Sequence, residues 1–134
     1  MLILDKLKPF PKCDIATDDK SLAAWCRWWR DALGLQEWVL ECRFSRFHAI
    51  DNAYGRTSMK NSLKYAAIQL LTDLDSEDDD TNFDIEQTLV HELLHIKLWH
   101  HGQPEQDTLE HVMQEQTIDT LAWSLVNLRR MKRG

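Results

Sequence analysis

Residues 84–102 restrict the fold of this 134-residue chain more than any other segment. Asp84, followed three positions later by Gln87, has the spacing of an N-terminal capping box, and Gly102 is the next helix-stopping residue. We therefore predict a helix over about 85–100. Apolar residues cover most of its sides, which is typical of a central, buried helix: Ile85, Leu89, Leu93 and Ile96 on one face, and Val90, Leu94 and Leu98 on another.

This predicted helix carries His91 and His95, four residues apart, with Glu92 directly after the first. Residues at this spacing share one face of a helix, with Cβ atoms roughly 5–6 Å apart, so both imidazoles can reach one metal ion. An HExxH sequence on a helix is typical of zinc hydrolases, in which the glutamate is the general base. Unpaired polar groups beside a buried face cost roughly 1–3 kcal/mol each, and one metal ion would satisfy both rings. The alternative is a pair of core histidines hydrogen-bonded to their neighbours.

A second helix is predicted over about 108–130, because Asp107 and Glu110 have the spacing of another capping box. His111 and Glu115 lie at the edge of its predicted inward stripe, and Asp119 follows one turn after Glu115. No Lys or Arg occurs between residues 98 and 128, which favours a metal ion as the partner of these carboxylates. A catalytic zinc takes three protein ligands and leaves a fourth position for water. The predicted stripe contains Ile118, Leu121, Ala122 and Leu125.

The pattern formed by His91, Glu92 and His95, then nineteen residues, then Glu115 and Asp119 resembles the gluzincin pattern of thermolysin-type metallopeptidases. This short chain is most similar to the minigluzincins, compact forms with a helix, a small sheet, an active-site helix and a glutamate helix. The resemblance implies that His91, His95 and Glu115 are ligands of Zn²⁺ and that Glu92 is the general base. It also implies that Asp119 orients a ligand histidine, a role with a clear physical basis.

The sequence departs from that family in one respect. Thermolysin-type enzymes hold the transition-state oxyanion with a Tyr and a His from segments that this chain lacks. The candidates by residue type alone are Tyr54, Tyr65, His100 and His101.

The remaining elements are predicted from periodicity and turn residues. A helix from Asp18 or Asp19 to Leu33, ended by Gly34, places Trp25, Trp28 and Trp29 on one face as core residues. Strands are expected over 38–47, 54–59 and 63–72, with a turn at 60–62 before the last. The order predicts one α+β domain spanning residues 1–134. In the resembled family the strand before the active-site helix forms the cleft rim. We therefore expect residues 65–71 to accept an extended peptide if they form a sheet edge.

Composition limits the possible environments and partners. The net charge is −6, which argues against strong nucleic-acid binding. No segment approaches the eighteen or more apolar residues of a membrane span. The cysteines, Cys13, Cys26 and Cys42, form neither a CxxC site nor a disulfide framework, so we expect a reducing cytoplasm and buried thiols. The acidic residues 73–80 are expected to form a solvated connection.

Three functions follow from these patterns. The leading one is a small zinc endopeptidase that acts on a peptide or protein substrate, with zinc lowering the pKa of its bound water to about 7. The second is a SprT-like protease acting near DNA, in which a third histidine completes the metal site. That ligand would be His111 or, with less support, His100 or His101. If Glu115 is the ligand instead, His111 is expected to line the cleft, where it could contact substrate. The third is a zinc-binding regulatory domain without activity. The phosphate contacts of the second would be Arg27, Arg30, Arg43, Arg46, Arg56, Lys60, Lys64 and the tail of Arg129, Arg130, Lys132 and Arg133.

Overall fold

A computed structural model of the chain describes residues 9–11, 18–46, 54–71, 84–98, 105 and 107–133. Within these residues the chain is a mixed α+β structure with three α-helices and a three-stranded sheet, as predicted. The elements, in chain order, are α1 (Asp19–Ala32), β1 (Val39–Ser45), β2 (Gly55–Lys60), the 3-10 turn η3 (Asn61–Leu63), β3 (Tyr65–Leu71), α2 (Ile85–Lys97) and α3 (Leu109–Arg133).

The ends of α1 and the start of α2 follow their sequence signals. Asp18 caps α1 in a full capping box with Ser21, and Gly34 follows the helix with a φ of 73°. Asp84 caps α2 by accepting a 3.0 Å hydrogen bond from the backbone N–H of Gln87. The Gln87 side chain, however, donates to α3 and not back to the cap. Helix α2 ends at residue 97, earlier than predicted, and residues 99–102 lie outside the described part of the chain.

The predicted start of α3, at about residue 108, is correct to within one residue, but the predicted cap at Asp107 is wrong. Asp107 has a positive φ of 66°, and the helix begins at residue 109. The Thr108 hydroxyl accepts a 3.2 Å hydrogen bond from the backbone N–H of His111 and so caps the helix. A threonine can replace an aspartate in this role because either side-chain oxygen accepts the same free backbone donor.

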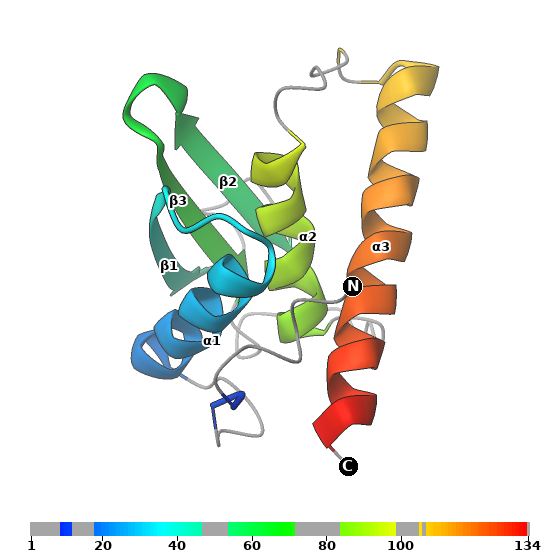
Figure 1. Ribbon diagram of the computed structural model, residues 1–134. Helices are drawn as coiled ribbons and strands as arrows, with labels where there is room; N and C mark the ends of the chain where they lie inside the picture. The colour runs from blue at the N-terminus through cyan, green and yellow to red at the C-terminus, as the bar shows by residue number, and fades with distance from the viewer. Residues whose placement is uncertain are drawn as a thin grey trace.

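The sheet has the order β1-β3-β2, with β1 parallel and β2 antiparallel to β3 (Figure 1). Strand β3, at residues 65–71, is therefore central, so the condition for accepting an added peptide strand, that these residues form a sheet edge, is not met. Both sides of its backbone are already paired with neighbouring strands. The turn between β2 and β3 is η3, which lies one residue later than predicted and ends at Lys64 with a φ of 47°.

Helices α1 and α2 pack on one face of the sheet, and α2 lies between the sheet and α3 (Figure 1). Period-two alternation sets this face, because Ala66, Ile68 and Leu70 of β3 are fully buried in the core. Trp25 and Trp29 are buried and Trp28 packs against the same core, as predicted for α1. Leu121 is exposed and does not belong to the inward stripe of α3. The buried residues of that helix are Ile118, Ala122, Val126 and Arg129, which follow a spacing of three or four residues that turns Leu121 toward solvent.

A buried ionic cluster joins the three helices. Glu86 of α2 is 1% exposed and forms an ion pair with Arg129 of α3. The same carboxylate accepts a 2.9 Å hydrogen bond from the indole N–H of Trp29 in α1. The Arg129 guanidinium carbon lies 3.8 Å from the centre of the Phe10 ring. These contacts fix the rotation of α2 against α3, and this orientation determines which α3 side chains face the HExxH residues.

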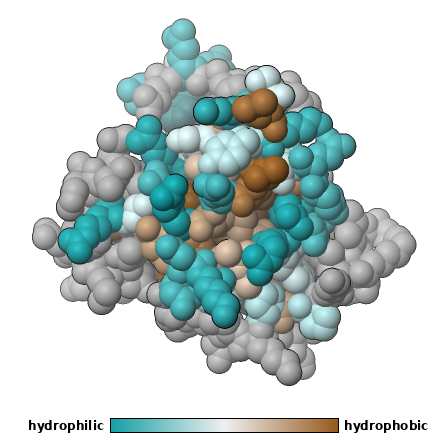
Figure 2. Space-filling view, turned by 90° about the vertical axis from the view of Figure 1, so that its left-hand side faces the viewer, coloured by the Kyte–Doolittle hydropathy of each residue, from teal (hydrophilic) through white to brown (hydrophobic). Residues whose placement is uncertain are grey.

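The space-filling view in Figure 2 shows hydrophilic residues around a smaller apolar area. Exposed residues of β1 and β2 include Arg43, Arg56 and Lys60. None of the described helices combines the length and the hydropathy that crossing a membrane requires.

Candidate metal centre

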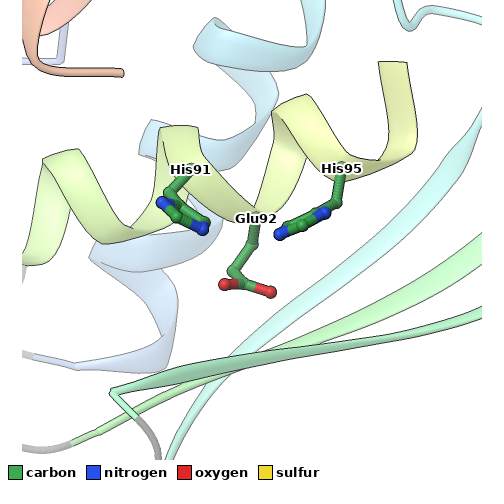
Figure 3. A group of neighbouring side chains, drawn as sticks. All are labelled: His91, Glu92 and His95. Carbon is green, nitrogen blue, oxygen red and sulfur yellow. The ribbon is translucent and has the colours of Figure 1, made fainter. Parts of the chain in front are cut away.

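The side chains of His91, Glu92 and His95 project from the same side of α2. Glu92 lies between the two imidazoles and points toward the neighbouring strands (Figure 3). The ring centroids of His91 and His95 are 5.1 Å apart, so the two imidazoles lie next to each other on one face of the helix. One ligand atom from each of His91, Glu92 and His95 lies within 4.8 Å of the others. The local sequence thus brings together, on a single helix, three side chains that could hold a metal ion.

Helix α3 adds a carboxylate between the two histidines. Glu115 Oε2 lies 3.0 Å from His91 Nε2, and Glu115 Oε1 lies 2.9 Å from His95 Nε2. The two oxygens of one side chain therefore each face a different imidazole. This contact joins residues at least twenty positions apart in the sequence and depends on the packing of α3 against α2.

Interactions within this group shift two pKa values. Hydrogen bonds from His91 and His95 hold the pKa of Glu115 well below its usual range. Burial by itself lowers the pKa of His91, but its hydrogen bond to Glu115 and the nearby negative charges of Glu92 and Glu115 outweigh burial and raise the pKa. The negative charges that favour a proton on His91 would equally favour a metal cation held between these side chains.

Asp119 lies on the other side of the His91 ring. Its Oδ1 is 3.3 Å from His91 Nδ1 and accepts a 2.6 Å hydrogen bond from the Gln87 side-chain amide. A carboxylate that accepts the Nδ1 proton leaves Nε2 of the neutral ring free to bind a metal. Gln87 was not identified from the sequence as part of the site, because its spacing from Asp84 was explained by the helix cap.

Strand β2 contacts the site at Glu92, a residue that is 8% exposed. The Thr57 hydroxyl donates a 2.7 Å hydrogen bond to Glu92 Oε1. Gly55, two residues earlier, permits this approach: a Cβ there would lie 2.9 Å from Thr88 Cγ2 and 3.2 Å from Glu92 Cγ. Sequence reasoning missed both residues, since a threonine and a glycine in a short strand carry no signal of their own.

The donor set fits a zinc ion. Two imidazole nitrogens and one carboxylate are the ligands that zinc takes in hydrolytic sites, and they leave a fourth position open. Two ligands of a tetrahedral zinc lie roughly 3.3–3.4 Å apart for bonds of about 2.0–2.1 Å. The nitrogen–oxygen separations of 3.0 and 2.9 Å are a few tenths of an ångström shorter, because hydrogen bonds hold these atoms.

His111 is nearby, and its contact with this group is through Glu115. Its Nε2 is 3.9 Å from Glu115 Oε1, and the side chain is 28% exposed. Of the tyrosine candidates for oxyanion stabilisation, Tyr65 donates its hydroxyl to Glu41 on β1, and Tyr54 is an exposed residue before β2. His100 and His101 lie outside the described residues.

The basic residues proposed for phosphate contact are partly engaged in ion pairs. Arg129 is 7% exposed and paired with Glu86, so it is not available to a nucleic acid. Arg130 pairs with Asp84 at 2.9 Å. Lys64 forms an ion pair with Glu37. These pairs weaken the electrostatic argument for a DNA-directed function.

Comparisons of the chain with family models, with curated proteins and with solved structures found no match. A functional assignment therefore depends on the geometry of α2, α3 and β2. That geometry places His91, His95, Glu115, Asp119 and Glu92 in one group.

Proposed function

We propose that this protein is a zinc-dependent peptidase of the gluzincin type. The observation that carries the proposal is the position of Glu115, whose two carboxylate oxygens face Nε2 of His91 and Nε2 of His95. Two imidazoles and a carboxylate leave one coordination position for water or substrate, which is the arrangement of a catalytic and not a structural zinc site.

Each residue of the group has a distinct task in this proposal. His91, His95 and Glu115 would hold Zn²⁺, which would supply Lewis-acid chemistry and lower the pKa of its bound water to about 7. Glu92 takes the proton of the attacking water and passes it to the departing amine of the peptide. Proton transfer by a positioned side chain contributes roughly 10²–10⁴-fold to the rate. Asp119, whose Oδ1 lies 3.3 Å from His91 Nδ1, would keep the proton of that ring on Nδ1 and leave Nε2 for the metal.

The geometry favours Glu115 over His111 as the third ligand. Glu115 contacts both imidazoles within 3.0 Å, whereas His111 approaches the group at Glu115 itself, with a separation of 3.9 Å. This supports the gluzincin-type assignment over a SprT-like one with a third histidine. A partly exposed position beside the ligand carboxylate is compatible with contact between His111 and substrate.

The test combines metal content with a peptide-library digest. The purified chain should contain one zinc ion, and it should cleave peptides in a reaction that a chelator abolishes and added zinc restores. Glu92→Gln should keep its zinc and lose hydrolysis, because the amide cannot accept the proton. Zinc without any cleavage, across a broad peptide library, would instead indicate a regulatory zinc-binding domain. A chain that binds no zinc at His91 and His95 would contradict both functions.

A further inference from the structure

Two glutamates lie within reach of the same histidine pair. Glu115 contacts both imidazoles, and a carboxylate oxygen of Glu92 lies within 4.8 Å of a ligand atom of each. Both carboxylates are therefore close enough to compete for one metal ion. A hydrolytic site needs one of them as a ligand and the other as a free base, so some feature must keep the two roles apart.

The two carboxylates differ in what else they contact. Glu115 is held by the histidines themselves. Glu92 accepts the 2.7 Å hydrogen bond from the Thr57 hydroxyl of β2, on the side of α2 that faces the sheet. The antiparallel register aligns Thr57 with the fully buried Ile68, so the Thr57 side chain belongs to the helix-facing side of the sheet.

We propose that Thr57 is a positioning residue that holds Glu92 away from the metal, so that Glu115 is the ligand and Glu92 remains the base. The inference rests on the proposed function. It adds a residue of β2 that keeps the roles of the two glutamates apart. A hydroxyl donor anchored in a strand can do this because it ties Glu92 Oε1 to β2 and so limits the movement of the carboxylate toward a metal ion. Hydrogen bonds to an ionised carboxylate are also stronger than neutral ones.

The close packing of β2 on α2 makes this restraint stiff. Gly55 brings the strand near Thr88 and the Glu92 stem, where no Cβ would fit without a shift. The backbone N–H of Leu71 donates a 2.8 Å hydrogen bond to the carbonyl of Tyr54, which extends the ladder beyond the first residue of β2. Thr57 is thus carried by a paired strand, and its hydroxyl cannot follow Glu92 if the carboxylate moves toward the metal.

The experiment uses the full chain loaded with Co²⁺, because zinc has a filled d shell and is spectroscopically silent. The visible absorption of Co²⁺ reports the number and type of its ligands without requiring any activity. The variants are Thr57→Val, which removes only the hydroxyl at nearly constant shape, and Thr57→Ser, which restores it. Ser58→Ala is the matched control, since Ser58 is the next residue of β2 and is exposed. Glu92→Gln and the double variant Thr57→Val/Glu92→Gln complete the set.

The expected spectra follow from Glu92 moving into the metal's coordination. Thr57→Val should change the cobalt spectrum toward a higher coordination number, while Thr57→Ser and Ser58→Ala match the wild type. The change should vanish in the double variant, because the side-chain amide that Glu92→Gln introduces is a much weaker ligand than a carboxylate. With a cleavable peptide, Thr57→Val should lower kcat by about 10- to 100-fold, the range of a hydrogen bond to a charged group, at nearly constant KM.

An unchanged cobalt spectrum in Thr57→Val would overturn the proposal, as would a change that persists in the double variant. Circular dichroism melting checks that each variant folds, and Thr57→Ala replaces Thr57→Val if the valine does not. The two proposals fail differently. Zinc and cobalt binding without hydrolysis rejects the peptidase, but the spectra still decide the role of Thr57. A wild-type chain that binds neither metal overturns both.

Discussion

Glu86 of α2 and Arg129 of α3 form an ion pair that is almost completely buried, with side chains 1% and 7% exposed. The pair lies on the same two helices that carry the histidines and Glu115. It therefore links the stability of the fold to the geometry of the candidate metal centre.

Glu86→Ala should lower the free energy of unfolding by about 3–5 kcal/mol, because it leaves the Arg129 charge buried without its partner. Equilibrium unfolding in urea measures the change. The double variant Glu86→Leu/Arg129→Met should lose much less, since it removes both charges and keeps the apolar volume. Lys64→Ala, at the exposed pair with Glu37, is the control and should leave the unfolding midpoint nearly unchanged. Equal losses in Glu86→Ala and the double variant would contradict this account.

Removing zinc should lower the melting temperature. An ion that binds only the native state adds about 2.7 kcal/mol to stability when its free concentration is about 100 times the dissociation constant. Scanning calorimetry with zinc, and then with excess chelator, measures the difference. The His91→Ala/His95→Ala variant should show no such difference, and a zinc-dependent shift in that variant would place the ion elsewhere.

Glu115→Ala should weaken zinc binding far more than His111→Ala does. Glu115 faces both imidazoles, while His111 lies 3.9 Å from Glu115 and outside the histidine pair. We expect a loss greater than the roughly 10- to 100-fold that is typical of an outer-shell residue. Competition with a chromophoric chelator gives the dissociation constants. The reverse order would support a three-histidine, SprT-like site and make DNA a partner to test.

Asp119→Ala should reduce zinc affinity by about 10- to 100-fold without removing a ligand, because His91 loses the carboxylate that fixes its ring. Gln116→Ala, at an exposed position of the same helix, is the control and should bind zinc like the wild type. The same chelator competition applies. Wild-type affinity in Asp119→Ala would show that His91 does not depend on this contact.

Gly55→Ala should destabilise the fold by about 1–3 kcal/mol, the usual cost of overpacking. The new methyl group would lie 2.9 Å from Thr88 Cγ2. Thr88→Ser removes that methyl and keeps the hydroxyl that donates to the Asp84 carbonyl, so the double variant should recover part of the loss. Urea unfolding of the single and double variants decides the point, and no recovery would mean that Leu70 or Glu92 causes the strain.

Local signals in the sequence determined where the helices begin and that His91 and His95 lie on one face of a helix. Asp84 caps α2 as predicted, because a capping side chain bonds a backbone N–H only three residues away. The i, i+4 spacing of His91 and His95 makes their side chains neighbours in any α-helix. Their proximity could therefore be predicted without knowledge of tertiary contacts. The α+β class followed from the order of such elements.

Tertiary structure decided the contacts between elements. The central position of β3, the buried pair of Glu86 with Arg129 and the hydrogen bond from Thr57 to Glu92 all depend on segments that are distant in the sequence. No local propensity encodes which strands pair or which side of a helix meets its neighbour, since these depend on burying all apolar faces at once. The sequence therefore determined the two histidines and their helix, whereas the packing of β2 and α3 against α2 decided which residues surround them.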